Sequence, residues 1–105
     1  MDKIMNEVCV FLADGFEEIE GLTVVDLLRR AGIETRTVSI MGQEEIKGAH
    51  GIIVKADSLF ENTDFSEVKM LVLPGGMPGT IHLKEHKGLE GLILKHNEEK
   101  KYLAA

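Results

Sequence analysis

Hydrophobic residues occur along this chain in short runs that alternate with amphipathic segments. Residues 8–13 form an apolar run rich in strand-favouring residues, which breaks at Asp14-Gly15 and gives way to a helical pattern ending at Gly32. This order predicts a strand, a tight turn and a helix, which is half of a βαβ unit. The β-branched run over residues 33–40 predicts a second strand, parallel to the first through a crossover.

The middle of the chain contains a flap, a buried strand and a glycine-rich loop. Two short apolar pieces within residues 46–55 predict a small hairpin, and Asp57 with Ser58 is expected to cap a short turn. Residues 70–73 are uniformly apolar, which is typical of a central parallel strand covered on both faces. The sequence PGGMPG at residues 74–79 excludes helix and strand and frees backbone amides to point outward.

The last third of the chain is predicted to be helical and then to return to strand. Residues 80–85 and 88–101 have helical patterns, and residues 102–105 are apolar again. In a β-α-β-α order, these last four residues read as the opening of the next strand. We therefore expect residues 1–105 to be the N-terminal portion of a single larger α/β domain, because a sheet lacking its next central strand exposes unpaired edges and a hydrophobic groove.

Composition and charge exclude several classes of protein. The net charge of -6 and the sequence pI near 5.2 argue against nucleic acid or an anionic membrane surface as the main partner. The apolar runs are far shorter than the roughly 20 residues of a membrane span, and we expect a cytoplasmic protein. The single cysteine, Cys9, is predicted to be a buried core thiol, since one cysteine forms neither an internal disulfide nor a CxxC site.

A carboxylate at the start of the first helix is the first candidate for chemistry. Glu20 shares a helical face with Val24, Leu27, Leu28 and Ala31, which predicts that it begins the stripe packed on the sheet. A buried carboxylate either has a fixed hydrogen-bond partner or exchanges a proton near neutral pH. The simpler alternative is that the acids of the segment GFEEIE only favour the helix N-terminus through its dipole.

Three motifs in order carry a resemblance to a known family. They are GFEEIE at residues 15–20, VVDLLRRAG at residues 24–32 and LPGGMPG at residues 73–79. Together they resemble the DJ-1/PfpI (ThiJ) superfamily, and within it the DJ-1-like bacterial branch. The resemblance implies a flavodoxin-like fold, in which a doubly wound, mostly parallel sheet has helices on both faces as a three-layer sandwich, here incomplete. It also implies a homodimer.

The resemblance assigns roles to three residues. Glu20 falls where the family places the carboxyl group that hydrogen-bonds its reactive cysteine, and Gly75 and Gly76 fall on its backbone oxyanion donors. The family's cysteine directly follows an apolar strand ending in two alanines, here Ala104 and Ala105, so this 105-residue chain lacks the nucleophile and is expected to be inactive alone. A C-terminal remainder of the same protein would supply it. No metal and no cofactor are implied.

The remaining polar residues are predicted to lie on the surface or between subunits. Asp26 and Arg30, at i and i+4, predict a surface ion pair. His82 and His86 have the same spacing and predict a solvated helix face rather than a metal site. From the resemblance, the residues expected at a dimer interface are Glu17, Ile19, Asp26, Arg30 and His50.

Several activities follow from the resemblance. The first is cysteine-dependent glyoxalase or deglycase chemistry on a small carbonyl substrate or a glycated protein. The alternatives are a non-catalytic redox-sensing or chaperone-like stress-response dimer, and a protease-like, amidase-like or thiazole-biosynthesis ThiJ relative. A class I glutamine amidotransferase-like relative shares the glycine loop and stays open. A receiver domain is set aside, because it needs an aspartate where this chain has Leu73-Pro74-Gly75.

Overall fold

A five-stranded parallel sheet forms the centre of the molecule. A computed structural model describes residues 8–99 and 101–104, and the sheet order is β5-β2-β1-β6-β7. Every pairing within this sheet is parallel, as the chain pattern predicts. The strands are β1 (Val8–Leu12), β2 (Thr35–Ser39), β5 (Ser58–Leu59), β6 (Met70–Val72) and β7 (Tyr102–Ala104).

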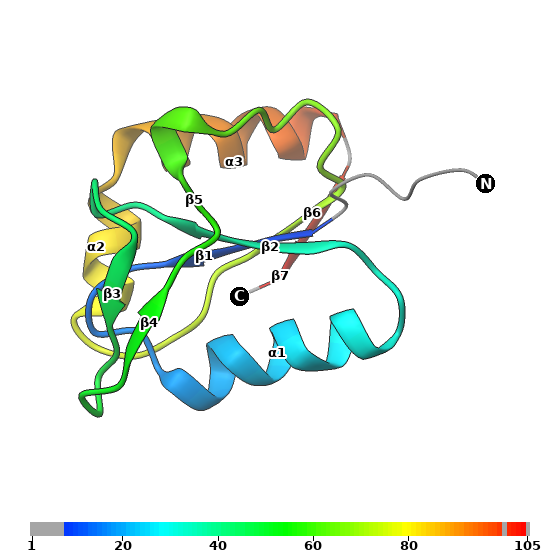
Figure 1. The fold of residues 1–105 in the computed structure, drawn as a ribbon. Helices are drawn as coiled ribbons and strands as arrows, with labels where there is room; N and C mark the ends of the chain where they lie inside the picture. The colour runs from blue at the N-terminus through cyan, green and yellow to red at the C-terminus, as the bar shows by residue number, and fades with distance from the viewer. Residues whose placement is uncertain (1–7, 100, 105) are drawn as a thin grey trace.

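Helices cover both faces of the sheet. Helix α1 (Glu18–Arg30) lies on one face, and helices α2 (Gly79–Glu85) and α3 (Lys87–Glu98) lie on the other (Figure 1). Side chains of the fully buried strand β1 alternate between the two layers: Phe11 packs toward α2 and α3, and Leu12 packs toward α1. The predicted doubly wound α/β architecture is confirmed.

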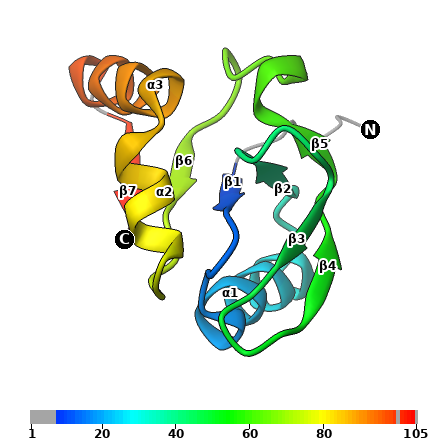
Figure 2. The ribbon, with the colours of Figure 1, turned by 90° about the vertical axis from the view of Figure 1, so that its left-hand side faces the viewer.

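A two-stranded hairpin lies beside the main sheet. Strands β3 (Glu45–Lys47) and β4 (Ile53–Lys55) pair antiparallel, which confirms the predicted flap. Its tip contacts the start of α1, since the Ala49 amide donates to the Phe16 carbonyl at 2.8 Å (Figure 2). The predicted cap at Asp57 is wrong: Asp57 accepts hydrogen bonds from Thr37 and Arg29 instead, and the turn η1 (Phe60–Asn62) has no side-chain cap.

The face of α1 that packs on the sheet differs from the predicted one. Glu20 and Ala31 are exposed and Leu27 is 58% exposed, whereas the buried residues of this helix are Glu18, Gly21 and Val25. Val24 and Leu28 of the predicted stripe do pack against the core, but its start at Glu20 and its members Leu27 and Ala31 are wrong. The buried charge at the start of α1 is the carboxylate of Glu18, two positions earlier.

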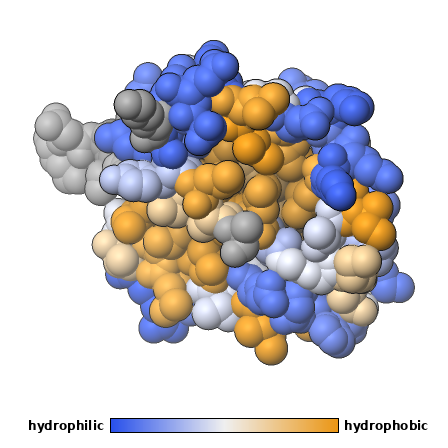
Figure 3. Space-filling model, turned by 180° about the vertical axis from the view of Figure 1, so that it is seen from behind, coloured by the Kyte–Doolittle hydropathy of each residue, from blue (hydrophilic) through white to orange (hydrophobic). Residues whose placement is uncertain are grey.

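Strand β7 forms one edge of the sheet. The Tyr102 amide donates to the Lys69 carbonyl, and the Leu73 amide donates to the Ala104 carbonyl, so the backbone groups of Leu103 face away from β6. No strand among residues 8–99 and 101–104 pairs with that outer edge. Apolar side chains gather on the face of the molecule seen from behind (Figure 3). Leu103 of β7 is half-exposed.

The sequence predicts the strand at this edge of the sheet. The strand predicted over residues 102–105 is confirmed through Ala104, and Ala105 lies outside the described residues. Pairing of β7 with a further strand stays a prediction.

Over the described part of the chain, no helix is both long enough and apolar enough to cross a membrane.

Candidate functional site

The carboxyl ends of β1 and β6 meet at one edge of the sheet, where polar groups from both following loops converge. After β1, Gly15 adopts a positive φ of 88°, and the Phe16 amide closes the turn on the Ala13 carbonyl at 3.0 Å. The ring of Phe16 is fully buried and anchors the turn. Helix α1 then starts at Glu18, so its first turn projects into the space above β6.

The loop after β6 is fastened to the start of α1. The Glu17 amide donates to the Gly75 carbonyl at 2.8 Å, while the amide and hydroxyl of Thr80 both donate to the Gly76 carbonyl. Gly76 has φ 103°, and a β-carbon there would lie 2.5 Å from the Glu17 nitrogen. Both the backbone conformation and the close approach therefore require glycine at this position.

The structure brings together the three residues predicted for catalysis. Oε1 of Glu20 accepts a hydrogen bond of 2.9 Å from the Gly75 amide, and Gly76 follows in the same loop. Glu20 is exposed in this chain and lines two neighbouring cavities. One, of about 470 Å³, lies toward α2 and α3, and the other, of about 580 Å³, lies toward α1 and contains Ala104 of β7.

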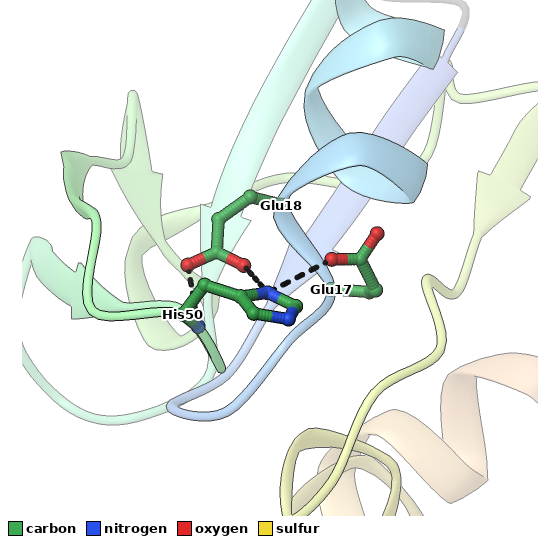
Figure 4. Close-up of side chains that lie close together, drawn as sticks. All are labelled: Glu17, Glu18 and His50. Atoms are coloured by element: carbon green, nitrogen blue, oxygen red, sulfur yellow. Dashed lines mark hydrogen bonds and ion pairs between the residues drawn. The ribbon is translucent and has the colours of Figure 1, made fainter.

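Sequence reasoning missed a second polar cluster, formed by Glu18, His50 and Glu17. The buried carboxylate of Glu18 accepts hydrogen bonds from the His50 amide at 2.8 Å and the Ile52 amide at 3.2 Å, both at the hairpin tip. Its other oxygen lies 2.9 Å from Nδ1 of His50, and the Glu17 carboxylate lies 3.2 Å from the same nitrogen (Figure 4). His50 thus lies in a cluster of charged groups.

These contacts move the pKa values of both partners. Desolvation opposes ionisation of Glu18, but hydrogen bonds from the His50 ring and from the backbone amides of Glu18, His50 and Ile52 outweigh it and lower the pKa from 4.5 to about 2. The hydrogen bond and the charge of Glu18 raise the pKa of His50 above 6.5. The result is an ion pair that ties the hairpin tip to the start of α1.

The same three side chains are one group that can offer ligands to a metal ion. Oxygen atoms of Glu17 and Glu18 and a ring nitrogen of His50 lie within 4.8 Å of one another, and this is the one such group of three or more in the part of the chain that the structure describes. Hydrogen bonds among these groups and the hairpin amides account for the arrangement. We assign the cluster a structural role.

The residues predicted at a dimer interface are accessible in this chain. Ile19 is 71% exposed, and Arg30 and Asp26 form the predicted exposed ion pair at 3.0 Å. Glu17 and His50 belong to the cluster just described. Their placement between two subunits stays a prediction.

The remaining candidates take structural roles. Cys9 is buried as predicted, and desolvation raises the pKa of its thiol to about 11. His82 and His86 do not share a helix as predicted, because α2 ends at Glu85 and His86 caps α3 by accepting from the Leu89 amide at 2.9 Å. The break is a helix N-cap that the i, i+4 spacing conceals.

The chain matches the family model described as the DJ-1/PfpI family over residues 6–105. The chain belongs to this family. It is 32% identical to protein DJ-1 homolog A of Arabidopsis thaliana over its whole length, which is 27% of that protein. It is 35% identical to a protein named as a deglycase from Thermococcus kodakarensis, covering 75% of this chain and 48% of the relative.

A solved structure agrees with this assignment. Toxoplasma gondii DJ-1, described as oxidized, superposes with a TM-score of 0.90 at 32% identity, covering 94% of this chain and 54% of that one. The chain thus spans between about a quarter and about half of the length of the DJ-1/PfpI relatives it matches. The family assignment and the fold support each other.

Proposed function

We propose that this chain supplies the acid and the oxyanion-binding loop of a cysteine-dependent active site that acts on reactive carbonyl compounds or their adducts. The observation that carries the proposal is the hydrogen bond between Glu20 and the Gly75 amide, which unites two segments 55 positions apart at the carboxyl edge of the sheet. A relative of similar sequence is named as a deglycase.

Strand β7 supports a position for the thiol next to Glu20. Ala104, near the end of this strand, lines the same cavity as Glu20, and the Leu73 amide donates to its carbonyl. The DJ-1-like pattern puts the reactive cysteine directly after this strand. In a longer protein, a cysteine following Ala105 would therefore begin beside the carboxyl group of Glu20.

These groups suit the isomerisation and hydration of an α-oxoaldehyde to a 2-hydroxy acid. The thiolate attacks the aldehyde carbon, the carbonyl π electrons move to oxygen, and a backbone amide of the glycine loop stabilises this oxyanion, an effect worth about 3 to 4 kcal/mol per donor. Glu20 donates a proton to this oxygen, and its carboxylate then takes the proton from the former aldehyde carbon and returns it to the adjacent carbon. The hydroxyl proton passes to the neighbouring carbonyl oxygen, which leaves a thioester of the 2-hydroxy acid. Water then hydrolyses the thioester and restores the thiol.

The test is methylglyoxal consumption by the full-length protein. We expect Glu20→Gln to lower kcat/KM by about 100-fold or more, because the amide cannot transfer the proton. The matched control is Glu90→Gln, which changes an exposed glutamate in the first turn of α3 and should leave the rate within about twofold of wild type. Wild-type turnover by the Glu20 variant would remove this residue from the mechanism.

A second candidate function is a redox sensor with chaperone-like protection. It is favoured by the Toxoplasma relative, whose solved structure is described as oxidized. In this case the thiol is oxidised by peroxide to a sulfinate that accepts a hydrogen bond from protonated Glu20. Peroxide titration with intact-mass detection should then show two oxygen atoms added at one thiol at low peroxide, with no turnover of methylglyoxal.

A further inference from the structure

A lysine lines the cavity of about 470 Å³ that contains Glu20. Lys84 belongs to α2, which covers the opposite face of the sheet from α1 and its Glu20 (Figure 1). Among the described residues that line this cavity, these two are the only charged ones. Most of the remaining lining is apolar and includes Leu83, Leu89 and Ile93. The cavity therefore combines one acid and one base, from different helices, with apolar walls.

The Lys84 ammonium has no partner in the part of the chain that the structure describes. Each ion pair of a lysine within residues 8–99 and 101–104 uses another lysine, and the Lys84 side chain makes no hydrogen bond there. Thr80, one turn earlier on α2, already donates its hydroxyl to the Gly76 carbonyl at 2.8 Å. Lys84 is thus the side-chain donor that this cavity offers to a ligand.

The charge of Lys84 decides whether an anion can enter this cavity. The chain has 18 acidic and 12 basic residues, and Glu20 lines the same cavity, so an approaching anion is repelled unless a cation compensates. Apolar walls lower the local dielectric constant and strengthen the attraction to the ammonium. A single ammonium matches a single negative charge, which favours a carboxylate over a phosphate dianion.

We propose that Lys84 is a specificity-determining residue that binds a carboxylate of the substrate, so that the protein acts best on short α-oxoaldehydes with a carboxylate at the opposite end. The ammonium donates to the carboxylate, while the aldehyde lies toward Glu20. This inference rests on the proposed function for the chemistry at the aldehyde, whereas the carboxylate site is tested by binding alone.

The first experiment measures binding of 4-oxopentanoate to the full-length protein by NMR titration. This compound keeps the carboxylate, the spacer and one carbonyl group but has no aldehyde, so no reaction obscures binding. We expect about tenfold weaker binding of its methyl ester to wild type, and an equal loss for the carboxylate in Lys84→Gln. The ester should bind wild type and Lys84→Gln equally, because both changes remove the same interaction.

Lys87→Gln is the matched control for the loss of one positive charge. Lys87 is an exposed lysine at the start of α3 that does not line the cavity, so binding of 4-oxopentanoate should stay within about twofold of wild type. Lys84→Arg keeps the charge and should retain most of the affinity. Equal binding of acid and ester by wild type, or equal losses in Lys84→Gln and Lys87→Gln, overturns the proposal.

The second experiment compares turnover of 4,5-dioxopentanoate, the corresponding α-oxoaldehyde, with turnover of its methyl ester. In wild type, kcat/KM should favour the carboxylate about tenfold, mainly through KM, and Lys84→Gln should abolish this preference. A preference that survives in Lys84→Gln assigns the discrimination to another residue and contradicts the role of Lys84.

The specificity role and the proposed function fail in different ways. If binding of 4-oxopentanoate depends on Lys84 but the full-length protein has no thiol-dependent turnover of either aldehyde, the proposed function fails and the carboxylate site stands. If methylglyoxal turnover needs Glu20 while binding and turnover do not distinguish acid from ester, the role of Lys84 fails alone.

Discussion

Replacing Gly15 with alanine is expected to lower the free energy of unfolding by about 3 kcal/mol, a large effect for one added methyl group. Two causes add. Gly15 has φ 88°, a conformation that costs an L-residue roughly 1–2 kcal/mol. A β-carbon would also lie 2.3 Å from Cδ and 2.5 Å from the nitrogen of Pro78, and backbone at that distance cannot move aside as a flexible side chain can.

Gly32→Ala separates these two causes. Gly32 has nearly the same φ, 82°, but a β-carbon there meets nothing within 4 Å. We expect this variant to lose only the conformational contribution, about 1 kcal/mol. The measurement is urea denaturation of both variants, and equal losses in the two would show that the contact between Gly15 and Pro78 contributes nothing.

The contact at Gly15 matters beyond stability, because it sets the distance between the two loops of the candidate site. Pro78 precedes α2, and Gly15 precedes α1. The turn after β1 and the loop after β6 are therefore packed directly on each other, which brings Glu20 within hydrogen-bond distance of Gly75. A shift at Gly15 should propagate to that hydrogen bond.

The central strands and the order of elements could be predicted from the sequence for a simple reason. Strand β1 is buried on both faces and β6 lies between β1 and β7, so both strands read as continuous apolar runs bounded by turn residues. Parallel strands separated by helices place their carboxyl ends at the same edge. This rule alone predicts that Glu20 lies near Gly75, before any contact between them is known.

The buried face of α1 could not be predicted, because apolar residues surround this helix. Leu22 and Val25 continue one face, while Val24 and Leu27 continue another, so periodicity fits two stripes. What distinguishes them is Gly21, where a β-carbon would lie 3.0 Å from the Phe16 ring and 3.5 Å from the Pro74 ring. Helix α1 therefore packs closely against the Phe16 and Pro74 rings at its smallest residue, Gly21.

The contact between Glu18 and His50 could not be predicted from the sequence either. His50 lies 32 positions away at the tip of a hairpin, and only the packing of that hairpin on α1 brings the two together. Gly48 is the one local signal: a β-carbon there would lie 2.3 Å from the carboxyl carbon of Glu18. Glycine is common at hairpin tips because of the turn geometry alone, so the sequence did not reveal this contact.

Removing the Glu18 carboxylate should be the next most damaging change. In Glu18→Ala the amides of His50 and Ile52 lose their acceptor, and His50 loses its nearest anion, so we expect the Tm to fall by on the order of 10 °C. The matched control is Glu17→Ala. Within residues 8–99 and 101–104 its carboxylate pairs only with the His50 ring, at 3.2 Å, and thermal unfolding should show a drop of no more than about 3 °C.

The pH dependence of unfolding gives this cluster a separate signature. The pKa of Glu18 falls from 4.5 to about 2 on folding, so its contribution is complete above pH 4.5 and is lost as the pH falls toward 2. The pKa of His50 rises above 6.5, so its contribution is complete below pH 6.5 and is lost as the pH rises through the raised value. The cluster therefore stabilises the fold most between these two limits.

Two variants show which residue causes the loss of stability at acidic pH and which causes the loss at alkaline pH. Glu18→Gln keeps the side-chain volume without the charge, so the difference in unfolding free energy between wild type and variant should peak between pH 4.5 and 6.5 and shrink on both sides. His50→Gln keeps the backbone amide that donates to Glu18, so this variant should abolish only the change in unfolding free energy at alkaline pH. A difference between wild type and Glu18→Gln that stays constant from pH 3 to 9 would mean that Glu18 stabilises the hairpin by shape alone, without its charge.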